Sequence, residues 1–405
     1  MTLWSKNYTI ITIGTIISAI GGVGINFAIG VLVYNQTQST LLTALFSAVV
    51  MIPNIIFPLF IGPNIDRFSR KNIIVRSDML MGIVFLAIAY ITKDGYFNYS
   101  MYMVLGFILS TNGVIYGIAY ESLFPELIPE KMMQQGYAIS SLIYPLVNTI
   151  MLPIAAIVFE NYGPSAIFLF EGILLLIASF FERFIKIDEA QIKRFKETPQ
   201  KLRVMIKDGL DYLKNERGLI AIFSFFFFLM MAGEGLNTLL YPFFENHPTL
   251  TITQFAYLSS FITAGRLVGG IWHYVFKVKT HHRFMVAAFV YFSLNVLNGI
   301  LLLVPYPFML ALQVVMGILS INSFNIRMSS VQTYVPSEKR GRVNGVYHIL
   351  VSSGMIIGRL IAGTLGEFFP YQWIVMGFSF IGILAFFFII VAQAPHVRAI
   401  YNRKV

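Results

Sequence analysis

Several charged side chains lie inside long apolar stretches of this sequence, where an unpaired charge is costly. The acids are Asp78, Glu171 and Glu234, and the bases are Arg266, Arg327 and Arg359. A carboxylate in a surrounding of low dielectric constant takes up a proton more readily than in water. An arginine stays charged and binds carboxylates or phosphates with its planar fork. The acids are therefore candidates for proton uptake, and the arginines are candidates for anion binding.

Among the acids, Glu234 is the first candidate for a proton-coupling residue. It lies in "MMAGEGLNTLLYPFF", between Gly233 and Gly235, which leave room for a bound molecule or water. The alternative is a structural ion pair of Glu234 with Arg266 or Arg359. Replacing Glu234 by Gln separates the two interpretations.

Glu171 and Asp78 are the other proton-coupling candidates. Glu171 falls in the outer half of an apolar stretch, whereas Asp78 follows Arg76 near the inner start of another. For Asp78, and for Glu121 at the inner end of the next stretch, a structural ion pair with Arg76 or with the charged turn at 62–71 is the alternative.

The arginines outnumber the acids in the second half of the sequence, which leaves surplus positive charge in its apolar part. This favours an anionic bound molecule held by Arg266 and Arg359, with Arg327 as a third candidate that could instead extend to the inner surface. Further polar candidates for lining a binding site are Asn26, Asn322 and Asn325. Each asparagine could equally form a hydrogen bond between helices.

The amino-acid composition indicates which structural elements must position these charged residues. The chain has 405 residues, of which 57% are hydrophobic and 12% are charged, whereas soluble proteins carry about 25% charged residues. Apolar blocks of about 20 residues are long enough to span a bilayer as helices. We expect spans at 8–33, 41–62, 73–92, 100–124, 136–158, 164–185, 219–244, 253–275, 284–304, 306–334, 343–366 and 371–394. The fold class expected is an all-α integral membrane protein with twelve transmembrane helices.

The basic residues predict the orientation. With a cytoplasmic N-terminus, 25 of the 29 Lys and Arg fall on the cytoplasmic side, and Lys93 alone falls in the outer loops. This bias follows the positive-inside rule. We therefore expect a multi-pass protein of the cell membrane with both termini cytoplasmic. Its net charge of +10 would then face anionic lipids, not a nucleic acid.

Other chemistry is not expected. The chain has no cysteine, so disulfides and thiol catalysis are excluded. It contains no phosphate-binding loop, and His281 and His282 lack an acid or cysteine nearby that would complete a metal site. We expect no enzyme activity, no metal and no cofactor, and a proton gradient as the source of energy.

An internal repeat divides the chain. "LIPEKMMQQG" after span four and "YVPSEKRGRVNG" after span ten place Pro129 and Pro336 207 residues apart. The same offset relates Gly62 to Gly269, and nearly relates span one to span seven. The sequence thus predicts two pseudo-symmetric six-helix bundles at 1–185 and 219–395. A cytoplasmic linker at 186–218 and a cytoplasmic tail at 396–405 complete the chain.

The linker contains one amphipathic segment. "QKLRVMIKDGLDYLKNERG" places Leu202, Met205, Ile206, Leu210 and Leu213 along one helical face. Such a helix suits the inner membrane surface. It could equally join the two halves and pack beneath them.

These features resemble the major facilitator superfamily. The turn "GPNIDRFSRK" supplies the signature glycine, Asp-Arg pair and basic residues of that family, with Ser69 where the family prefers glycine. The resemblance implies that the turn is a conformational latch on the cytoplasmic side. Its residues would be Gly62, Asp66, Arg67, Arg70 and Lys71. The alternative is a simple positive-inside anchor, which explains the bases but not Asp66.

Other segments are similar to one branch of the superfamily. "VLVYNQTQSTLLTALFSAVVMIP", "FPELIPEK" and "VPSEKRGRVNG" resemble exporters that include macrolide efflux proteins and siderophore exporters. The resemblance implies a monomeric secondary transporter that exports a small molecule by alternating access, with proton antiport. The intramembrane arginines favour an anionic, metallophore-like substrate. Efflux of amphipathic drugs and lipid flipping are the alternatives.

Overall fold

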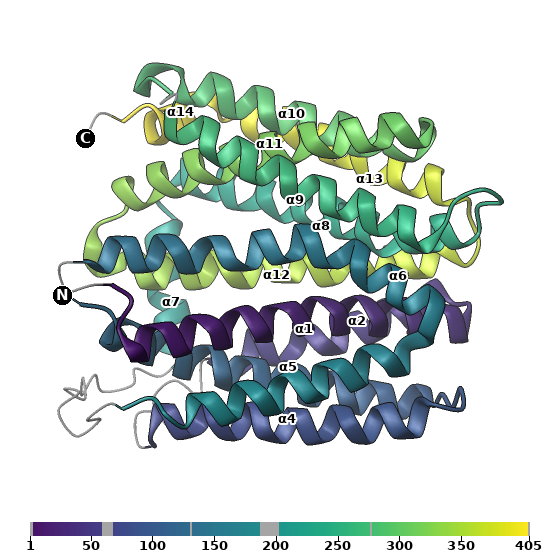
Figure 1. Cartoon of the computed structure of the whole chain (residues 1–405). Coiled ribbons are helices and arrows are strands. Elements are labelled where there is room, and N and C mark those ends of the chain that lie inside the picture. Colours follow the sequence, from purple (N-terminus) through teal and green to yellow (C-terminus); the bar gives the residue numbers. More distant parts are fainter. Residues whose placement is uncertain (1–2, 59–67, 130–131, 187–201, 276–277, 404–405) are drawn as a thin grey trace. The chain divides into compact units, whose positions relative to one another are not determined.

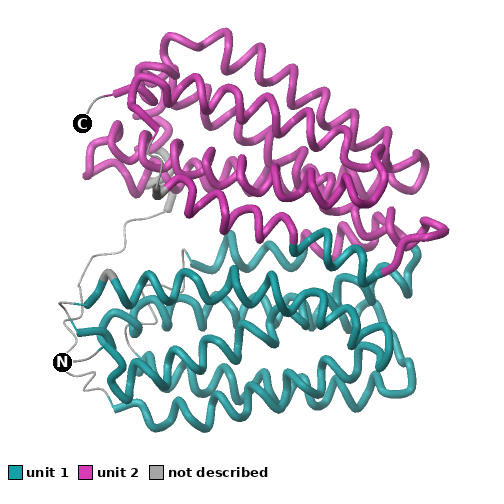
Figure 2. Tube along the Cα trace, turned by 45° about the horizontal axis from the view of Figure 1, so that its top comes forward, with its two compact units in different colours: residues 1–38, 49–199, 252–260 teal, residues 39–48, 200–251, 261–405 magenta. Residues whose placement is uncertain are grey.

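The structure, a computed structural model, describes residues 3–58, 68–129, 132–186, 202–275 and 278–403 (Figure 1). The chain forms two compact units (Figure 2). Unit 1 comprises residues 1–38, 49–199 and 252–260, and unit 2 comprises residues 39–48, 200–251 and 261–405. Relative to the predicted halves, the start of span two groups with unit 2 and the start of span eight with unit 1. The predicted domain boundaries remain a prediction.

Unit 1 is built mainly from long apolar helices. They are α1 (Lys6–Thr37), the later part of α2 (Thr40–Ile56), α4 (Arg70–Thr92), α5 (Tyr99–Leu123), η1 (Phe124–Leu127) and α6 (Met133–Glu182). Side-chain caps fix where three of them begin, because Ser5, Ser69 and Asn98 each accept a hydrogen bond from a backbone N–H three residues later. Such caps satisfy N–H groups that have no partner within the helix. In this unit α6 packs along both α1 and α4.

One helix, α6, contains predicted spans five and six together. Gly163 has a φ of 74° and a ψ of 176°, a conformation that glycine adopts without strain. Pro164 follows and has no N–H to donate. The two residues therefore break α6 where the sequence predicts a loop, and they allow the chain to cross the membrane twice.

Unit 2 contains the remaining helices. They are α7 (Leu202–Leu213), α8 (Arg217–Glu245), most of α9 (Ile252–Val275), η3 (Thr280–His282), α10 (Arg283–Ile300), η4 (Leu301–Leu303), α11 (Tyr306–Tyr334), α12 (Ser337–Gly366), α13 (Tyr371–Ala385), the π-helical η5 (Phe386–Val391) and α14 (Ala394–Tyr401). Within it α8 packs along α12 and α13, and α10 packs along α13 and α11.

The span count agrees with the sequence. Nine helical stretches of the described residues are long and apolar enough to cross a membrane, and α6, with its break, is one of them. The shorter apolar helix α2 and α9 account for predicted spans two and eight. All described regular structure is helical, so the predicted fold class, an all-α membrane protein with twelve spans, is confirmed.

The linker helix α7 packs on the first turns of α12. Asp208 forms an ion pair of 3.0 Å with Arg342. The Gly209 backbone lies so close to α12 that an alanine Cβ there would meet the Arg342 carbonyl oxygen at 2.9 Å. This contact with α12 is consistent with a linker that packs on the helices of unit 2, and both interpretations of the segment remain predictions.

The last helix, α14, is a structured element where the sequence predicts only a tail. Tyr401 is fully buried and shares a hydrogen bond of 2.5 Å with the hydroxyl of Tyr291 in α10. The Asn402 side chain accepts a hydrogen bond from the backbone N–H of Phe284, at the start of α10. These contacts fasten the C-terminal helix to the transmembrane helices of unit 2.

Close packing of α9 on α11 gives a first prediction. An alanine Cβ at Gly317 would lie 2.8 Å from the backbone nitrogen of Arg266, whereas one at Gly345 of α12 would meet nothing within 4 Å. Gly317→Ala is therefore expected to destabilise the protein by about 1–3 kcal/mol, and Gly345→Ala is expected to leave stability unchanged or raised. Thermal unfolding of the purified variants in detergent measures both. Equal melting temperatures would contradict the packing described.

Candidate functional site

Unit 1 holds a pair of buried carboxyl side chains at the contact of α4 and α6. Asp78 of α4 is 4% exposed, and Glu182 of α6 is fully buried. Asp78 lies beside both Glu182 and Ser18 of α1. Nevertheless Asp78 Oδ2, both carboxyl oxygens of Glu182 and the Ser18 hydroxyl have no hydrogen-bond partner among the described residues. We call Asp78 and Glu182 the acid pair.

Two glycines of α1 make room for carboxyl groups of α6. An alanine Cβ at Gly14 would lie 2.6 Å from Glu182 Oε1, and one at Gly21 would overlap the carboxyl group of Glu171. Glu171 is also buried, and its Oε2 has no hydrogen-bond partner in the described part of the chain. The two glycines are seven residues apart, and helical residues at that spacing share a face. That face of α1 is thus shaped around two acids.

A fourth helix contributes a phenol. Tyr116 of α5 lies near Asp78 and Glu182 and beside Ser18, and its buried hydroxyl also lacks a partner among the described residues. Across the described ranges, no Lys or Arg forms an ion pair with Asp78, Glu171 or Glu182. A buried carboxylate without a compensating charge is strongly disfavoured, and a bound proton removes that cost. The arrangement is therefore suited to taking up and releasing protons.

The acids that the sequence selects in unit 1 lie in different surroundings in the structure. It places Asp78 and Glu171 among buried polar groups, which is consistent with the proton-coupling hypothesis but does not test it. The suggested pairing of Asp78 with Arg76 is wrong, because Arg76 is exposed and forms no ion pair in the described residues. Glu121 is exposed at the end of α5.

Sequence reasoning missed Glu182. It stands next to Arg183 at the end of a span, which favours a surface position for both. In the structure Arg183 is exposed and donates to the sulfur of Met79, while Glu182 points inward. The available signal was the spacing from Glu171, since eleven residues are close to three helical turns and place both acids on one face.

In unit 2 the leading candidate acid is already paired. Glu234 Oε2 accepts hydrogen bonds from Arg359 Nε at 2.9 Å and Arg359 Nη2 at 2.7 Å. Arg266, which is exposed, lies within electrostatic reach of Glu234. This is the structural alternative that the sequence left open, and it replaces an isolated Glu234. The three residues carry a net charge of +1, which suits the binding of an anion.

Arg327 is enclosed by aromatic rings. Its side chain is 5% exposed, and its guanidinium carbon lies 4.4 Å from the ring centroid of Tyr347 and 4.7 Å from that of Phe226. Such cation–π contacts stabilise a desolvated arginine. Its Nε has no hydrogen-bond partner among the described residues. The alternative that Arg327 extends to the inner surface is therefore wrong.

The three asparagine candidates lie in different surroundings. Asn322 Oδ1 lies 2.8 Å from His273 Nδ1, which joins α11 to α9 and matches the alternative of a hydrogen bond between helices. Asn325 is half-buried on α11, and Asn26 is exposed on α1. Asn26 and Asn325 remain candidates for a lining role.

The predicted latch is described only in part. Gly62, Asp66 and Arg67 lie outside the described residues. Arg70 donates to the backbone oxygen of Ser122 at 3.3 Å, and Lys71 donates to that of Arg183 at 2.7 Å. These two bases thus bind carbonyl groups near the ends of α5 and α6, where the negative ends of the helix dipoles attract cations. Their role in a latch remains a prediction.

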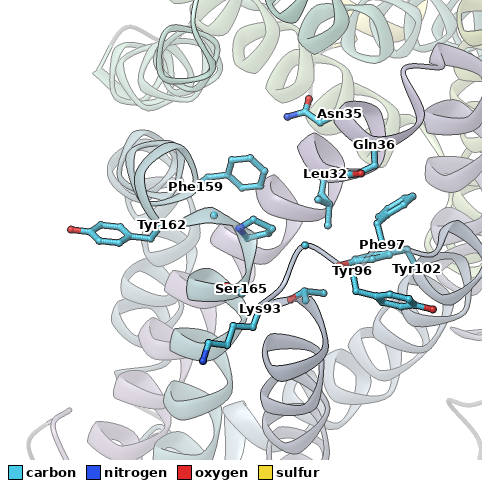
Figure 3. A pocket seen from close by; sticks show the side chains of 14 residues that line it. Leu32, Asn35, Gln36, Lys93, Tyr96, Phe97, Tyr102, Phe159, Tyr162 and Ser165 are labelled. Carbon is cyan, nitrogen blue, oxygen red and sulfur yellow. The ribbon is translucent and has the colours of Figure 1, made fainter.

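A separate pocket of unit 1 has a volume of about 260 Å³ (Figure 3). It lies between the end of α1, the segment that follows α4 and the break in α6. The residues that line it are Leu32, Asn35, Gln36, Thr92, Lys93, Gly95, Tyr96, Phe97, Tyr102, Phe159, Tyr162, Gly163, Pro164 and Ser165. None of them was selected as a site residue from the sequence, although Lys93 is the basic residue predicted on the outer side.

Comparison with known proteins gives one family. The model of the Major Facilitator Superfamily matches residues 11–294 and 279–403. Macrolide efflux protein A of Streptococcus pyogenes is 22% identical over 375 residues, which cover 90% of this chain and 90% of that protein. Macrolide efflux protein A of Enterococcus faecalis is 23% identical over 318 residues, which cover 76% of this chain and 95% of that protein.

A solved structure supports the fold. The crystal structure of the nucleoside transporter NupG has a TM-score of 0.70 and 15% sequence identity, and the match covers 96% of this chain and 99% of that one. At this identity the likeness concerns the fold alone. The family match spans most of the chain, and the helices have the expected number and length. The chain therefore belongs to the major facilitator superfamily, and it is a multi-pass membrane transporter, not an enzyme.

Proposed function

We propose that this protein exports amphipathic organic compounds of the macrolide type from the cell by alternating access. The relatives named for macrolide efflux match along nearly the whole chain, which supports export over uptake. In this proposal the protein acts as a monomer in the cell membrane, with both termini cytoplasmic. The strong bias of Lys and Arg toward one side supports that orientation.

Proton entry drives export in this proposal, and the acid pair is the coupling site. The observation that carries it is the burial of Asp78 and Glu182 without a basic partner in the described residues. Glu234 is a weaker candidate than the sequence suggested, because Arg359 already neutralises its charge. The acid pair would bind a proton when it is open to the outside and release it when it is open to the cytoplasm.

Ser18 and Tyr116 serve the acid pair in this mechanism. Their hydroxyl groups lie close to Asp78 and can donate to a carboxylate or accept from a carboxylic acid. Each can therefore satisfy the pair in both protonation states. Because the two acids lie side by side, the pair would titrate as one coupled unit.

Export itself can be tested in cells. The protein is produced in a bacterium that lacks its own macrolide exporters, and the accumulation of a labelled macrolide is measured. Expression should lower accumulation, and a protonophore should restore it. Accumulation that expression does not change would remove macrolides as substrates.

A second candidate substrate is an anion such as a carboxylate-bearing metallophore. The cluster of Arg266, Arg359 and Glu234, with its net charge of +1, favours this class. A substrate carboxylate would compete with Glu234 for Arg359 and would also gain the charge of Arg266.

Charge reversal separates the two substrate classes. Arg266→Glu is expected to weaken binding of an anionic substrate by at least about tenfold, since a close charge pair is lost and a repulsion is added. Export of an uncharged compound should change little. Lys279→Glu, an exposed residue outside the spans, is the matched control. Unchanged export of anionic compounds by Arg266→Glu would exclude this arginine from substrate binding.

A further inference from the structure

Two carboxylates hold the first turns of helices that belong to the opposite half of the sequence. Glu367 follows α12, in the second half. Its Oε1 accepts hydrogen bonds from the Leu41 backbone N–H at 2.8 Å and from Ser39 Oγ at 2.7 Å, and it lies 3.1 Å from Thr40 Oγ1. All of these residues belong to unit 2. Glu367 thus caps the N-terminus of α2, a helix of the first half.

The second carboxylate makes an equivalent contact in unit 1. Glu160 of α6 accepts the Thr253 backbone N–H on Oε1 at 2.9 Å and the Thr253 hydroxyl on Oε2 at 2.6 Å. Thr253 lies in the first turn of α9, so Glu160 caps a helix of the second half. A carboxylate at such a position satisfies free N–H groups and interacts favourably with the helix dipole.

The two contacts are related by the internal repeat. Glu160 and Glu367 are 207 residues apart, the offset that also relates Pro129 to Pro336. Each acid follows the fifth span of its half, and each capped helix is the second span of the other half. The duplication therefore produces the same carboxylate cap twice. Both caps lie at helix ends that the predicted topology assigns to the outer side.

Tight packing accompanies the Glu367 contact. Thr40 Oγ1 donates to the carbonyl oxygen of Gly363 at 2.7 Å. An alanine Cβ at Gly366 would lie 2.7 Å from Thr40 Oγ1. Glycine at this position thus lets α2 approach α12 closely. In unit 1, Phe255 of α9, two residues after Thr253, stacks on Phe27 of α1 with ring centroids 6.2 Å apart.

The charge of Glu367 is maintained by these contacts. Burial alone would raise the pKa of its carboxyl group, but the hydrogen bonds from Leu41, Ser39 and Thr40 outweigh it and hold the pKa below its usual value. The carboxylate is therefore ionised at neutral pH, which a charge-assisted cap requires.

We propose that Glu160 and Glu367 are a symmetric pair of outer clasps, which close the outer side of the transporter and must open when it releases its cargo. In alternating access the two halves rock against each other, so contacts between helices of different halves form on one side and break on the other. Each clasp joins the fifth span of one half to the second span of the other. The clasps thus favour the state that is closed to the outside. This inference depends on alternating access, but not on the proposed cargo or on proton coupling.

Distances between two spin labels can test the clasps in the absence of any cargo. The chain has no cysteine, so Asp94→Cys and Leu303→Cys, which are exposed positions outside α4 and α10, introduce a unique pair for distance measurement. Glu160→Ala with Glu367→Ala should raise the population with long label distances about three- to tenfold. Glu245→Ala is the matched control, because Glu245 accepts a hydrogen bond from Tyr241 of its own helix. Distance distributions equal to that of the parent would overturn the proposal.

A cross-link tests the same clasp from the opposite direction. Ser39→Cys with Glu367→Cys places two thiols at positions whose native side chains touch. A short bifunctional thiol reagent should then lower the export of the double cysteine variant at least about tenfold, and the same reagent should leave the export of each single cysteine variant unchanged. Full export by the cross-linked protein would contradict the clasp, whereas absent export in the unmodified parent would contradict only the proposed function.

Discussion

Asp78→Asn is expected to abolish proton-driven export while the protein remains folded. Asparagine keeps the size of the side chain but cannot carry the proton. Loss of coupling between a driving ion and a cargo should lower gradient-driven transport by at least about tenfold. Cargo should still move down its own gradient, because the substrate site is unchanged. Transport in proteoliposomes with and without an imposed pH gradient measures both rates.

Stability separates loss of coupling from loss of folding. Asp78 is buried without a basic partner in the described residues, so a neutral side chain of the same size removes the cost of desolvating a charge. Melting temperature should therefore be equal or higher in Asp78→Asn. Asp94→Asn, which changes an exposed acid just beyond α4, is the control and should leave both readouts unchanged. A fully coupled Asp78→Asn would remove this residue from the mechanism.

Gly21→Ala is expected to have the next largest effect, because its new methyl group would occupy the place of the Glu171 carboxyl group. The displaced acid must find another position in a packed interior, which should lower the free energy of unfolding by about 1–3 kcal/mol. Export should also fall if Glu171 contributes to proton movement. Thermal unfolding and export assays are run on the same preparations.

The neighbouring glycine is a sharp control for this prediction. An alanine Cβ at Gly22 would meet nothing within 4 Å, so Gly22→Ala should retain stability and export. Glu171→Ala combined with Gly21→Ala should recover part of the lost stability, since residues in contact have non-additive effects. Equal behaviour of the two glycine variants would show that Glu171 does not occupy the position described.

The sequence predicts the architecture well because hydrophobic length is a strong constraint in a membrane. Apolar blocks located all twelve spans, and the break at Gly163 lies in the predicted loop. Prediction was weaker where tertiary packing decides the outcome. The sequence predicts only a tail where the structure has the final helix, since the burial of Tyr401 depends on its contact with Tyr291 of α10.

For the candidate site, too, the sequence identifies individual residues but not the contacts that tertiary packing creates. The sequence identifies Glu234, Arg266 and Arg359 as costly charges, but it does not decide which of them pair. It selects Asp78 but not Glu182, because the neighbouring Arg183 favours a surface position for the end of that span, although the spacing from Glu171 places both acids on one helical face. Gly14 and Gly21 carry the missing information, and their meaning depends on which helix lies against them.

Proton-driven export, as proposed above, requires that protons and cargo move in opposite directions through this protein. The most direct measurement uses proteoliposomes that contain a pH-sensitive dye, with a macrolide gradient imposed across the membrane and no initial pH difference. We expect macrolide flow to drive protons in the opposite direction in the parent protein, and we expect Asp78→Asn to show macrolide flow without proton movement. Macrolide flow in the parent with no change in internal pH would contradict the proposed antiport.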